Sequence, residues 1–423
     1  MRRRLTAARF GMVGAAALAF GALAGCGGNA PGATTMGAFT ISAAPTAAAC
    51  DYKTQWVPPA GNVGLDDLAI TGPGQGWSVG ALTTNGYTGA PTGVIYRLNN
   101  GQWSRLPQTY PNAELSAIAM DSPTDGWAAS KTVMTTGHND RALVLHYTDG
   151  QWRQVDIPAL DAVLKGSPGT AGQAIMSLNI QMFGPNAGWM FADTNVSRDF
   201  NNPSSRLEVV ILHYIHGVWT LVPQPDTTIS TQISGFAAPS ADEAWVSFTD
   251  YGVGVYSTRF AHYINGAWSM APQVFPGTAG GITMTGPTNG WASAENDNTD
   301  APELFQYSGS AWRAVALPAR MRAEDWIRGP IALYPDSSAA WFVLIPSHGA
   351  EQIVQYASGQ WTTVAWPYAD ALPDHVIADS AGDLWGIGNI AHQRGCPPAF
   401  TVDVSQGVFY HQRQGEWSEQ VLV

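Results

Sequence analysis

The chain has 423 residues, of which 46 are glycine and 28 are proline; 45% of them are apolar and only 12% are charged. Glycine and proline at this level, without a period and not confined to one tail, exclude a helical protein, collagen and wholesale disorder. The net charge of −12 disfavours a nucleic-acid partner, because phosphate binding needs a clustered positive field.

Residues 1–25 have the build of a bacterial signal peptide. Four arginines precede an apolar run over 10–24, which is too short and too rich in glycine and alanine to span a bilayer comfortably. The run closes on the sequence LAGC, which resembles the lipobox of bacterial lipoproteins. The resemblance implies cleavage before Cys26 and lipidation of its sulfur, which would hold an extracytoplasmic protein on a membrane. An ordinary secretory signal with a chance cysteine is the alternative.

The next region, 26–49, is predicted to be the lipidated cysteine and a flexible tether. It contains glycine, alanine, serine, threonine and proline without any charge, and random-coil scaling gives it a reach of about 25 Å. Loss of the four signal-peptide arginines leaves 16 basic and 32 acidic residues, a net charge of −16. Such a surface repels anionic headgroups, so we expect the lipid alone to provide the membrane contact.

From residue 51 onward, 14 of the 17 tryptophans form two strictly interleaved series of seven members each. The first series is Trp77, Trp127, Trp189, Trp245, Trp291, Trp341 and Trp385; the second is Trp103, Trp152, Trp219, Trp268, Trp312, Trp361 and Trp417. The first series advances by about 51 residues a step, within the range of propellers and solenoids. Proline or glycine interrupts the chain too often for the paired helices of a helical solenoid.

Each repeat has the same order of segments. A short apolar segment such as 116–120 leads into a turn at 123–126, and a segment headed by Trp127 follows. After a variable loop come an alternating strand at 143–147 and a tight Asp149-Gly150 turn before the last strand. Aspartate–glycine and asparagine–glycine pairs between apolar runs are hairpin signals, because these residues accept positive φ. Four strands in about 50 residues are typical of a propeller blade.

We therefore predict an all-β fold, a seven-bladed β-propeller of four-stranded antiparallel blades that occupies 50–423. The blades are expected at about 63–107, 113–158, 174–223, 231–272, 279–318, 328–367 and 374–422. An eighth, partial blade is the alternative, since Trp56-Val57-Pro58 mimics the end of a fourth strand. The two tryptophan series are predicted to fill the wedges between blades rather than to form sugar-stacking platforms.

A polar residue recurs one position before the tyrosine position of the third strand. Its copies are Arg97, His146, His213, His262, Gln306, Gln355 and His411. Because each copy belongs to a separate blade, the four histidines should be too far apart to share a metal ion. We predict instead that these side chains bond the backbone of a neighbouring blade.

The repeats over 60–422 resemble the Asp-box (sialidase-like) and Kelch-like groups of propellers. The resemblance lies in hairpins such as Tyr-Thr-Asp149-Gly150-Gln-Trp152, although the spacing is shorter and some copies lack the acid. It implies the propeller architecture and no catalytic residue. The Arg-Ile-Pro motif of sialidases is missing, and the Kelch-type copper oxidases build their cofactor from a cysteine and a tyrosine. Both remaining cysteines here are better assigned to a disulfide.

That disulfide is predicted between Cys50 and Cys396. In an oxidising compartment an isolated cysteine pair indicates a disulfide rather than a metal or redox site, with two unpaired thiols as the alternative. Cys396 falls between the second and third strands of the last repeat, so the bond would tie the N-terminal segment to the last blade and stabilise it by a few kcal/mol.

Long, variable connections between strands two and three and between blades should share one face of the ring, where binding residues usually lie. On this face we single out Trp326, Trp366, Tyr368, Arg322 and Arg328 as a candidate aromatic and cationic patch for a sugar, aromatic or carboxylate ligand. The alternative is that these aromatic residues cap the top of the neighbouring blades.

Two loops add further candidates. Arg198 and Asp199 lie in the longest polar loop, a candidate contact loop. Glu295, Asp297 and Asp300 have partial calcium-loop spacing, but the glycine and the distal acid of an EF-hand are missing. We therefore assign no metal and no other cofactor, with calcium as the residual possibility.

These observations favour a non-catalytic, membrane-anchored, extracytoplasmic binding or scaffold propeller that uses its loop-rich face. No nucleophile–base or paired-carboxylate motif rises above background in the sequence. We expect a monomer whose partner is a protein or a glycan at the cell envelope. The alternative is a carbohydrate-active hydrolase or lyase of the sialidase-like propeller type, and a third reading is an assembly factor for an extracytoplasmic complex.

Overall fold

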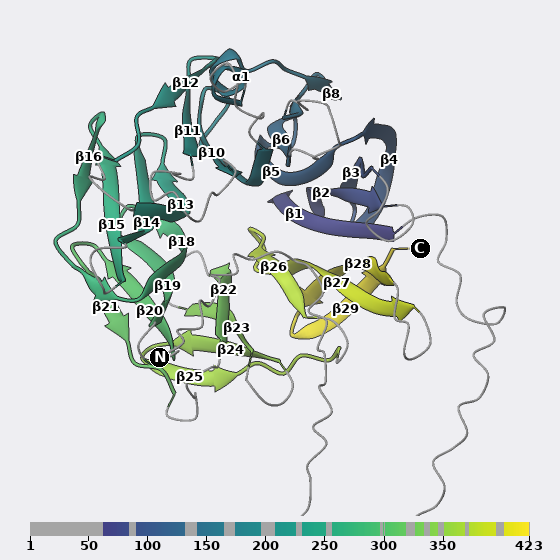
Figure 1. Ribbon diagram of the computed structural model, residues 1–423. Helices are drawn as coiled ribbons and strands as arrows, with labels where there is room; N and C mark the ends of the chain where they lie inside the picture. Colours follow the sequence, from purple (N-terminus) through teal and green to yellow (C-terminus); the bar gives the residue numbers. More distant parts are fainter. Residues whose placement is uncertain are drawn as a thin grey trace, which may run out of the picture.

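The computed structural model describes residues 62–83, 90–131, 142–164, 174–195, 208–225, 231–250, 256–296, 299, 301–318, 326–333, 339–345, 351–368, 372–394 and 402–422. Within these ranges the chain is built from short β-strands arranged around an axis, with a single short helix (Figure 1). No helix in the described part is long and apolar enough to cross a membrane.

Consecutive strands pair antiparallel in runs of four. The first runs are β1 (Asn62–Gly72), β2 (Gln75–Thr83), β3 (Thr92–Asn99) and β4 (Gln102–Pro111); β5 (Glu114–Ser122), β6 (Asp125–Lys131), β7 (Val144–Thr148) and β8 (Gln151–Gln154); and β9 (Ala174–Met182), β10 (Ala187–Asn195), β11 (Glu208–Ile215) and β12 (Val218–Val222). Next come β13 (Thr231–Ser240), β14 (Glu243–Asp250), β15 (Ser257–Ile264) and β16 (Ala267–Met270), with the two-residue β17 (Phe275–Pro276) on β15. The chain ends with β18 (Thr278–Gly286), β19 (Asn289–Asn296), β20 (Ala301–Ser308) and β21 (Trp312–Val315); β22 (Trp326–Leu333), β23 (Ala339–Ile345), β24 (Gln352–Ala357) and β25 (Gln360–Thr363); and β26 (Pro373–Ala378), β27 (Leu384–Arg394), β28 (Val402–Arg413) and β29 (Glu416–Val421).

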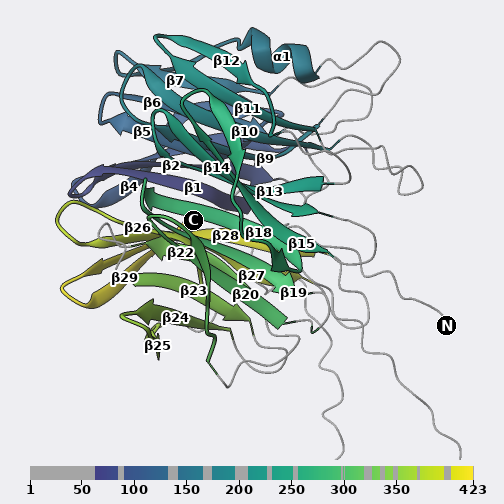
Figure 2. The ribbon, with the colours of Figure 1, turned by 90° about the vertical axis from the view of Figure 1, so that its left-hand side faces the viewer.

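The runs follow one another around the ring with their first strands innermost (Figures 1 and 2). The first strand of each run lies against the first strand of the next, from β1 through β5, β9, β13, β18 and β22 to β26, and β26 lies against β1. The last and first runs also share one eight-stranded sheet, because Val63 of β1 pairs in parallel with Gln406 of β28. The predicted all-β fold of four-stranded antiparallel sheets is therefore confirmed.

The hairpin turns between third and fourth strands have the predicted chemistry. In the β7–β8 turn, Asp149 has φ 52° and Gly150 has φ 76°. Asn100 and Asn265 also adopt positive φ, each followed by a glycine that does the same. Two successive positive φ values are what a two-residue hairpin loop needs to match the twist of its strands.

The repeat tryptophans fill the space between successive sheets, as predicted. All seven members of the first series are buried, with exposures between 0 and 4%. Trp77 meets Trp152 of the next run at a centroid distance of 5.6 Å, and Trp127 meets Trp219 at 5.4 Å. The same pairing joins the ends of the chain, since Trp385 of the last run lies 6.5 Å from Trp103 of the first. These indoles supply the large apolar areas that bind the wedge-shaped sheets together.

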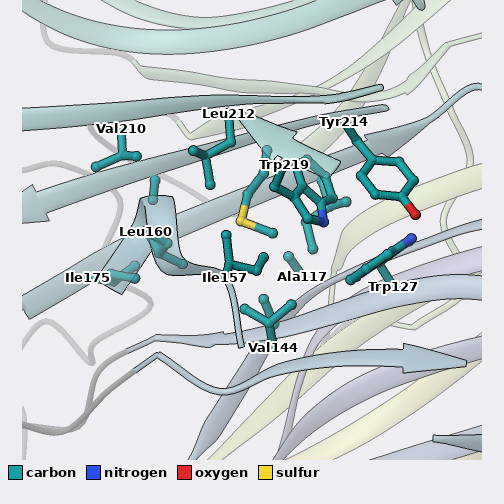
Figure 3. Packing of buried hydrophobic residues seen from close by; sticks show 14 of the residues in the cluster. Ala117, Trp127, Val144, Ile157, Leu160, Ile175, Val210, Leu212, Tyr214 and Trp219 are labelled. Atoms are coloured by element: carbon teal, nitrogen blue, oxygen red, sulfur yellow. The ribbon is translucent and has the colours of Figure 1, made fainter. Parts of the chain in front are cut away.

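One helix, α1 (Pro158–Leu164), lies in a connection for which the sequence analysis predicted only a loop. Proline at the first helical position is pre-organised for a helix, and Leu160 and Leu164 stand four residues apart on one face. Both leucines are buried between the β5–β8 and β9–β12 sheets, where Leu160 lies near Ile157 and Leu212 (Figure 3). Tertiary packing thus stabilises a helix too short to be stable alone.

The ring closes without exchanging a strand, because the last run takes all four of its strands from the C-terminal end. Two side-chain amides join it to the first run instead. Asn389 accepts a hydrogen bond from the Leu65 N–H and donates one to the Leu65 carbonyl, both at 3.0 Å. Gln420 accepts from the Trp103 N–H at 3.2 Å and donates to its carbonyl at 3.0 Å. Phe409 stacks on the Trp103 indole with centroids 4.1 Å apart.

The contacts of the recurring polar residue of the third strand differ from those that the sequence predicted. Among the described residues, His213 alone bonds the backbone of the next sheet, through the Ala241 carbonyl at 2.7 Å, and its imidazole also lies flat on Trp189. In three other repeats the imidazole lies flat on the first-series tryptophan of its own sheet and meets the carboxylate two residues before that tryptophan. The three triads, each with the distance from its histidine Nε2 to the carboxylate oxygen, are Trp127, His146 and Asp125 (3.1 Å); Trp245, His262 and Glu243 (3.4 Å); and Trp385, His411 and Asp383 (3.4 Å). The prediction missed them because the acid is close in the sheet register but 21, 19 and 28 residues away along the chain.

Candidate functional site

The two ends of the ring are unlike. The turns between strands one and two and between strands three and four are short, as at 73–74 and 100–101. At the opposite end the second strands end and the third strands begin, as at Thr83 and Thr92 or at Lys131 and Val144, and the chain passes from one run to the next. We call these the turn end and the loop-rich end.

A group of charged side chains lies at the loop-rich end, where β1, β5 and β6 approach one another. The Lys131 ammonium at the end of β6 donates to Asp66 Oδ1 at 3.1 Å and to Glu114 Oε1 at 3.0 Å. Glu114 stands directly opposite Lys131 in the β5–β6 register, a position from which unlike charges attract. Asp66 reaches the same lysine from the neighbouring run because a bulge between Leu65 and Asp67 displaces it from the β1–β2 ladder. We call Asp66, Glu114 and Lys131 the Lys131 cluster.

Asp67, the next residue of β1, ties three inner strands together. Its Oδ2 accepts a hydrogen bond from the Ile118 N–H of β5 at 2.9 Å. Its Oδ1 accepts from the Leu68 N–H at 2.9 Å and lies 3.1 Å from His375 Nδ1 of β26. The carboxylate is thus committed to holding neighbouring sheets in place beside the Lys131 cluster.

The cluster is partly open to solvent, with side-chain exposures of 23% for Asp66, 29% for Lys131 and 38% for Glu114. Burial raises the pKa of Asp66 to about 6 and outweighs the opposing attraction of Lys131; the Glu114 charge adds to the rise. Burial also disfavours the charged form of Lys131, but the attraction of the two carboxylates is stronger and raises the pKa of Lys131. Near neutral pH Asp66 can therefore hold or release a proton, while Lys131 stays charged.

The two carboxylates lie within about 6 Å of each other, since an oxygen of each touches the same nitrogen at ordinary hydrogen-bond length. The arrangement can hydrogen-bond a polar ligand, and it can supply a proton from Asp66. The part of the chain that the structure describes contains no group of three histidine, cysteine or acidic side chains able to hold a metal ion.

The structure places only some of the candidates from the sequence. Trp366 packs edge-on against Tyr410 at 4.9 Å and Trp417 at 4.6 Å, and Tyr368 lies 5.6 Å from Tyr410. These two candidates therefore come together over the last run, where both are partly buried against Val408 and Tyr410. Trp326 and Arg328 lie on β22, and Glu295 lies near the end of β19. The remaining candidates are outside the described residues: Cys26, Cys50, Arg198, Asp199, Asp297, Asp300, Arg322 and Cys396.

Sequence reasoning did not find the Lys131 cluster. Its members are 17 and 65 residues apart, so no local motif joins them. Two signals in the sequence could have indicated it. Asp66 and Asp67 interrupt an otherwise apolar first strand, and Lys131 is one of only three lysines in the chain.

Comparisons with known proteins identify the fold and no more. No protein-family model matches the chain, and no curated protein matches it. The β-propeller domain of the Trilobed protease from Pyrococcus furiosus, which has an open velcro topology, is similar over 85% of this chain and 97% of that domain, with a TM-score of 0.54 and 8% identity.

Two peptidases are similar in the same way. Acylaminoacyl peptidase from Pyrococcus horikoshii matches 85% of this chain and 52% of its own, with a TM-score of 0.52 and 11% identity. A puromycin-hydrolyzing peptidase from Mycobacterium tuberculosis matches 84% of this chain and 52% of its own, with a TM-score of 0.50 and 12% identity. The chain spans about half the length of these enzymes. At such identities the likeness establishes a propeller and leaves function open.

Proposed function

We propose that this protein is a seven-bladed propeller, anchored to the extracytoplasmic side of a membrane by a lipid on Cys26, that binds a protein or glycan partner at its loop-rich end without catalysing a reaction. The blade count follows if the eight-stranded sheet is taken as two blades, since it contains two complete antiparallel runs, β1–β4 and β26–β29. The anchor rests on the lipobox-like LAGC sequence behind a basic and apolar leader.

The observation that carries the binding role is the position of the Lys131 cluster. Its three half-buried, mutually hydrogen-bonded charges lie at the end of the ring that also bears the long connections. The first strands of adjacent runs, packed over a core of buried indoles, hold these charges in place. Polar groups held by a rigid scaffold recognise a partner at low entropic cost, because little has to be ordered on binding.

The pairing of the charges favours binding over catalysis. A catalytic carboxylate has to be available to its substrate, whereas Asp66 and Glu114 each accept a hydrogen bond from the Lys131 ammonium. The acidic surface and the shortage of lysine also favour a polar or cationic partner over an anionic one.

A comparison of two ends of the ring tests this proposal. The mature chain is immobilised through its C-terminus, and bound envelope proteins and glycans are identified after crosslinking. Lys131→Met removes the central charge of the loop-rich end, and Arg153→Met removes an exposed charge from the turn end as the matched control. We expect the captured partner to be lost at least tenfold with Lys131→Met and retained with Arg153→Met. Equal capture by both folded variants would contradict the proposal.

The anchor is tested separately. Cys26→Ser should move the protein from the membrane fraction to the soluble fraction, because each buried acyl methylene contributes roughly 0.8 kcal/mol to membrane binding. If the Cys26→Ser protein stays with the membrane, the lipid anchor is wrong whatever the partner proves to be.

One observation favours the alternative, a glycoside hydrolase. Asp66, with its pKa raised to about 6, and Glu114 form a carboxyl pair at roughly the separation of a retaining glycosidase. If this pair were catalytic, the mature chain would hydrolyse aryl glycosides, and Asp66→Asn and Glu114→Gln would each abolish the activity. An activity that survives both substitutions, or no activity across a panel of such substrates, excludes the alternative.

A further inference from the structure

The repeats serve as controls for one another at the turn end. In the three triads described above, the third-strand residue is a histidine, which can carry a positive charge. Its partner is an acid that lies two positions before the first-series tryptophan. Where the third-strand residue is Gln306 or Gln355, the corresponding turn residue is neutral, Asn289 or Ala339. His213, whose turn residue is Ala187, bonds the Ala241 carbonyl instead.

In the β1–β4 run the third-strand residue is a cation that has neither kind of partner among the described residues. Arg97 stands opposite Trp77 in the register, and its guanidinium lies over the indole, 5.1 Å from the ring centroid. The residue two positions before Trp77 is Gln75, so the acid is missing although the cation is present. Among the described residues Arg97 forms no ion pair, whereas Arg153 and Arg259 each pair with an aspartate.

A shallow pocket lies beside this exposed cation, in contact with the turns of two successive runs. It is lined by Thr71, Gln75, Gly76, Trp77, Arg97, Leu98, Asn99 and Pro123. The pocket is small, with a volume of about 50 Å³, so it has room for a single small polar group rather than a whole drug-sized ligand. The size suits one side chain or one small acid.

We propose that the Arg97 pocket binds a carboxylate, presented by an acidic segment of a protein partner. A guanidinium stacked on an indole keeps its edge N–H groups free, and that edge matches a carboxylate in two parallel hydrogen bonds. Thr71, Gln75 and Asn99 bring further donors to the rim of the same pocket. The ligand's carboxylate takes the place that Asp125, Glu243 and Asp383 occupy in their own repeats. This site is at the opposite end of the ring from the Lys131 cluster, so it stands or falls independently of the binding role proposed there.

Two substitutions are suggested by the repeats themselves. Arg97→Gln installs the residue that stands at this position as Gln306 and Gln355, so the fold should tolerate it. Gln75→Asp installs the acid of the triads and should occupy the guanidinium from within the chain. Arg153→Gln, an exposed arginine at the same end, is the matched control.

The probes are the peptide acetyl-Gly-Glu-Glu-Gly-amide, its Gln-Gln analogue and sodium acetate, each titrated into the mature chain and followed by the arginine Nε–H signals in NMR. We expect the acidic peptide to shift the Arg97 signal saturably, and Arg97→Gln and Gln75→Asp to weaken its binding at least tenfold while Arg153→Gln leaves it unchanged. Peptide binding that is much tighter than acetate binding supports a protein-borne carboxylate; equal binding of acetate supports a free small acid in its place. Any one of three results overturns the proposal. The acidic peptide binds Arg97→Gln as well as the unchanged protein, the Gln-Gln peptide binds as strongly as the acidic peptide, or no probe binds.

Discussion

The closure of the ring can be tested at Asn389, whose side chain makes three hydrogen bonds across or beside the seam between the last and first runs. Its oxygen accepts from the Leu65 N–H at 3.0 Å, and its nitrogen donates to the Leu65 carbonyl at 3.0 Å and to Asp374 Oδ2 at 3.1 Å. Asn389→Ala removes all three and leaves the Leu65 backbone groups without these partners. At about 1 kcal/mol net per bond, the free energy of unfolding should fall by about 3 kcal/mol.

Urea unfolding of the purified protein measures the loss, and amide hydrogen exchange locates it. The Leu65 amide should lose protection in Asn389→Ala, while the Trp103 amide, held by Gln420, should keep most of its own. Gln108→Ala is the matched control, since Gln108 makes one long bond of 3.4 Å to the Trp152 carbonyl at the seam between the first two runs. It should cost under about 1 kcal/mol. A loss below 1 kcal/mol for Asn389→Ala, with Leu65 still protected, would refute the role of these amides in closing the ring.

Three further predictions concern charge and packing. The pKa of Asp66 is raised to about 6 in the folded chain, against about 4 in the unfolded chain. Between these pH values the folded chain binds more protons, so it loses stability as the pH rises. The free energy of unfolding in urea should therefore fall by at most about 3 kcal/mol from pH 4 to 7, and Asp66→Asn should remove this fall. Burial lowers the pKa of His213, so stability should drop as the pH falls below about 6.5, and His213→Gln should lessen that drop in the same assay. Trp189 has 0% exposure, so Trp189→Ala should lower the free energy of unfolding by about 3–5 kcal/mol or more. Val218 is 57% exposed, and Val218→Ser should lower it by under about 0.5 kcal/mol. Similar losses for the two variants would contradict the packing role of the tryptophans.

The architecture could be predicted from the sequence because its determinants are local or strictly periodic. Positive φ at Asp149 and Gly150 follows from residue type alone, and it fixes a hairpin without reference to the rest of the chain. The wedges between sheets are filled by one residue type at one spacing, so the regular spacing of Trp77, Trp127 and their successors predicts that the sheets form a ring. Helix α1 was missed because its stability comes from the burial of Leu160 and Leu164 between two sheets, which no local pattern reports.

The candidate sites were far less predictable, for a reason visible in Lys131. Its partners come from two different runs, and one of them reaches it only because a bulge displaces Asp66 from the strand ladder. A bulge depends on how two strands register, and it leaves no residue signature of its own in this strand. The aromatic patch suggested around Trp366 rests on a different kind of signal. A tryptophan outside the periodic series stood out in the sequence, yet it contacts Tyr410 and Trp417 in the last run much as the periodic tryptophans contact their neighbours.

The two ends of the ring differ in how their charges are partnered, and this decides how much a departure from the pattern means. At the turn end each pairing is made within a repeat, as between His146 and Asp125, so the same position can be compared from run to run. At the loop-rich end Lys131 pairs with Glu114 of its own run and with Asp66 of the run before it, and no other described run repeats this arrangement. A cation without its acid is therefore informative at Arg97, because other copies of the same turn show what usually fills the place. The Lys131 cluster has no such control within the chain, so its role depends on substitution and capture experiments rather than on comparison among the repeats.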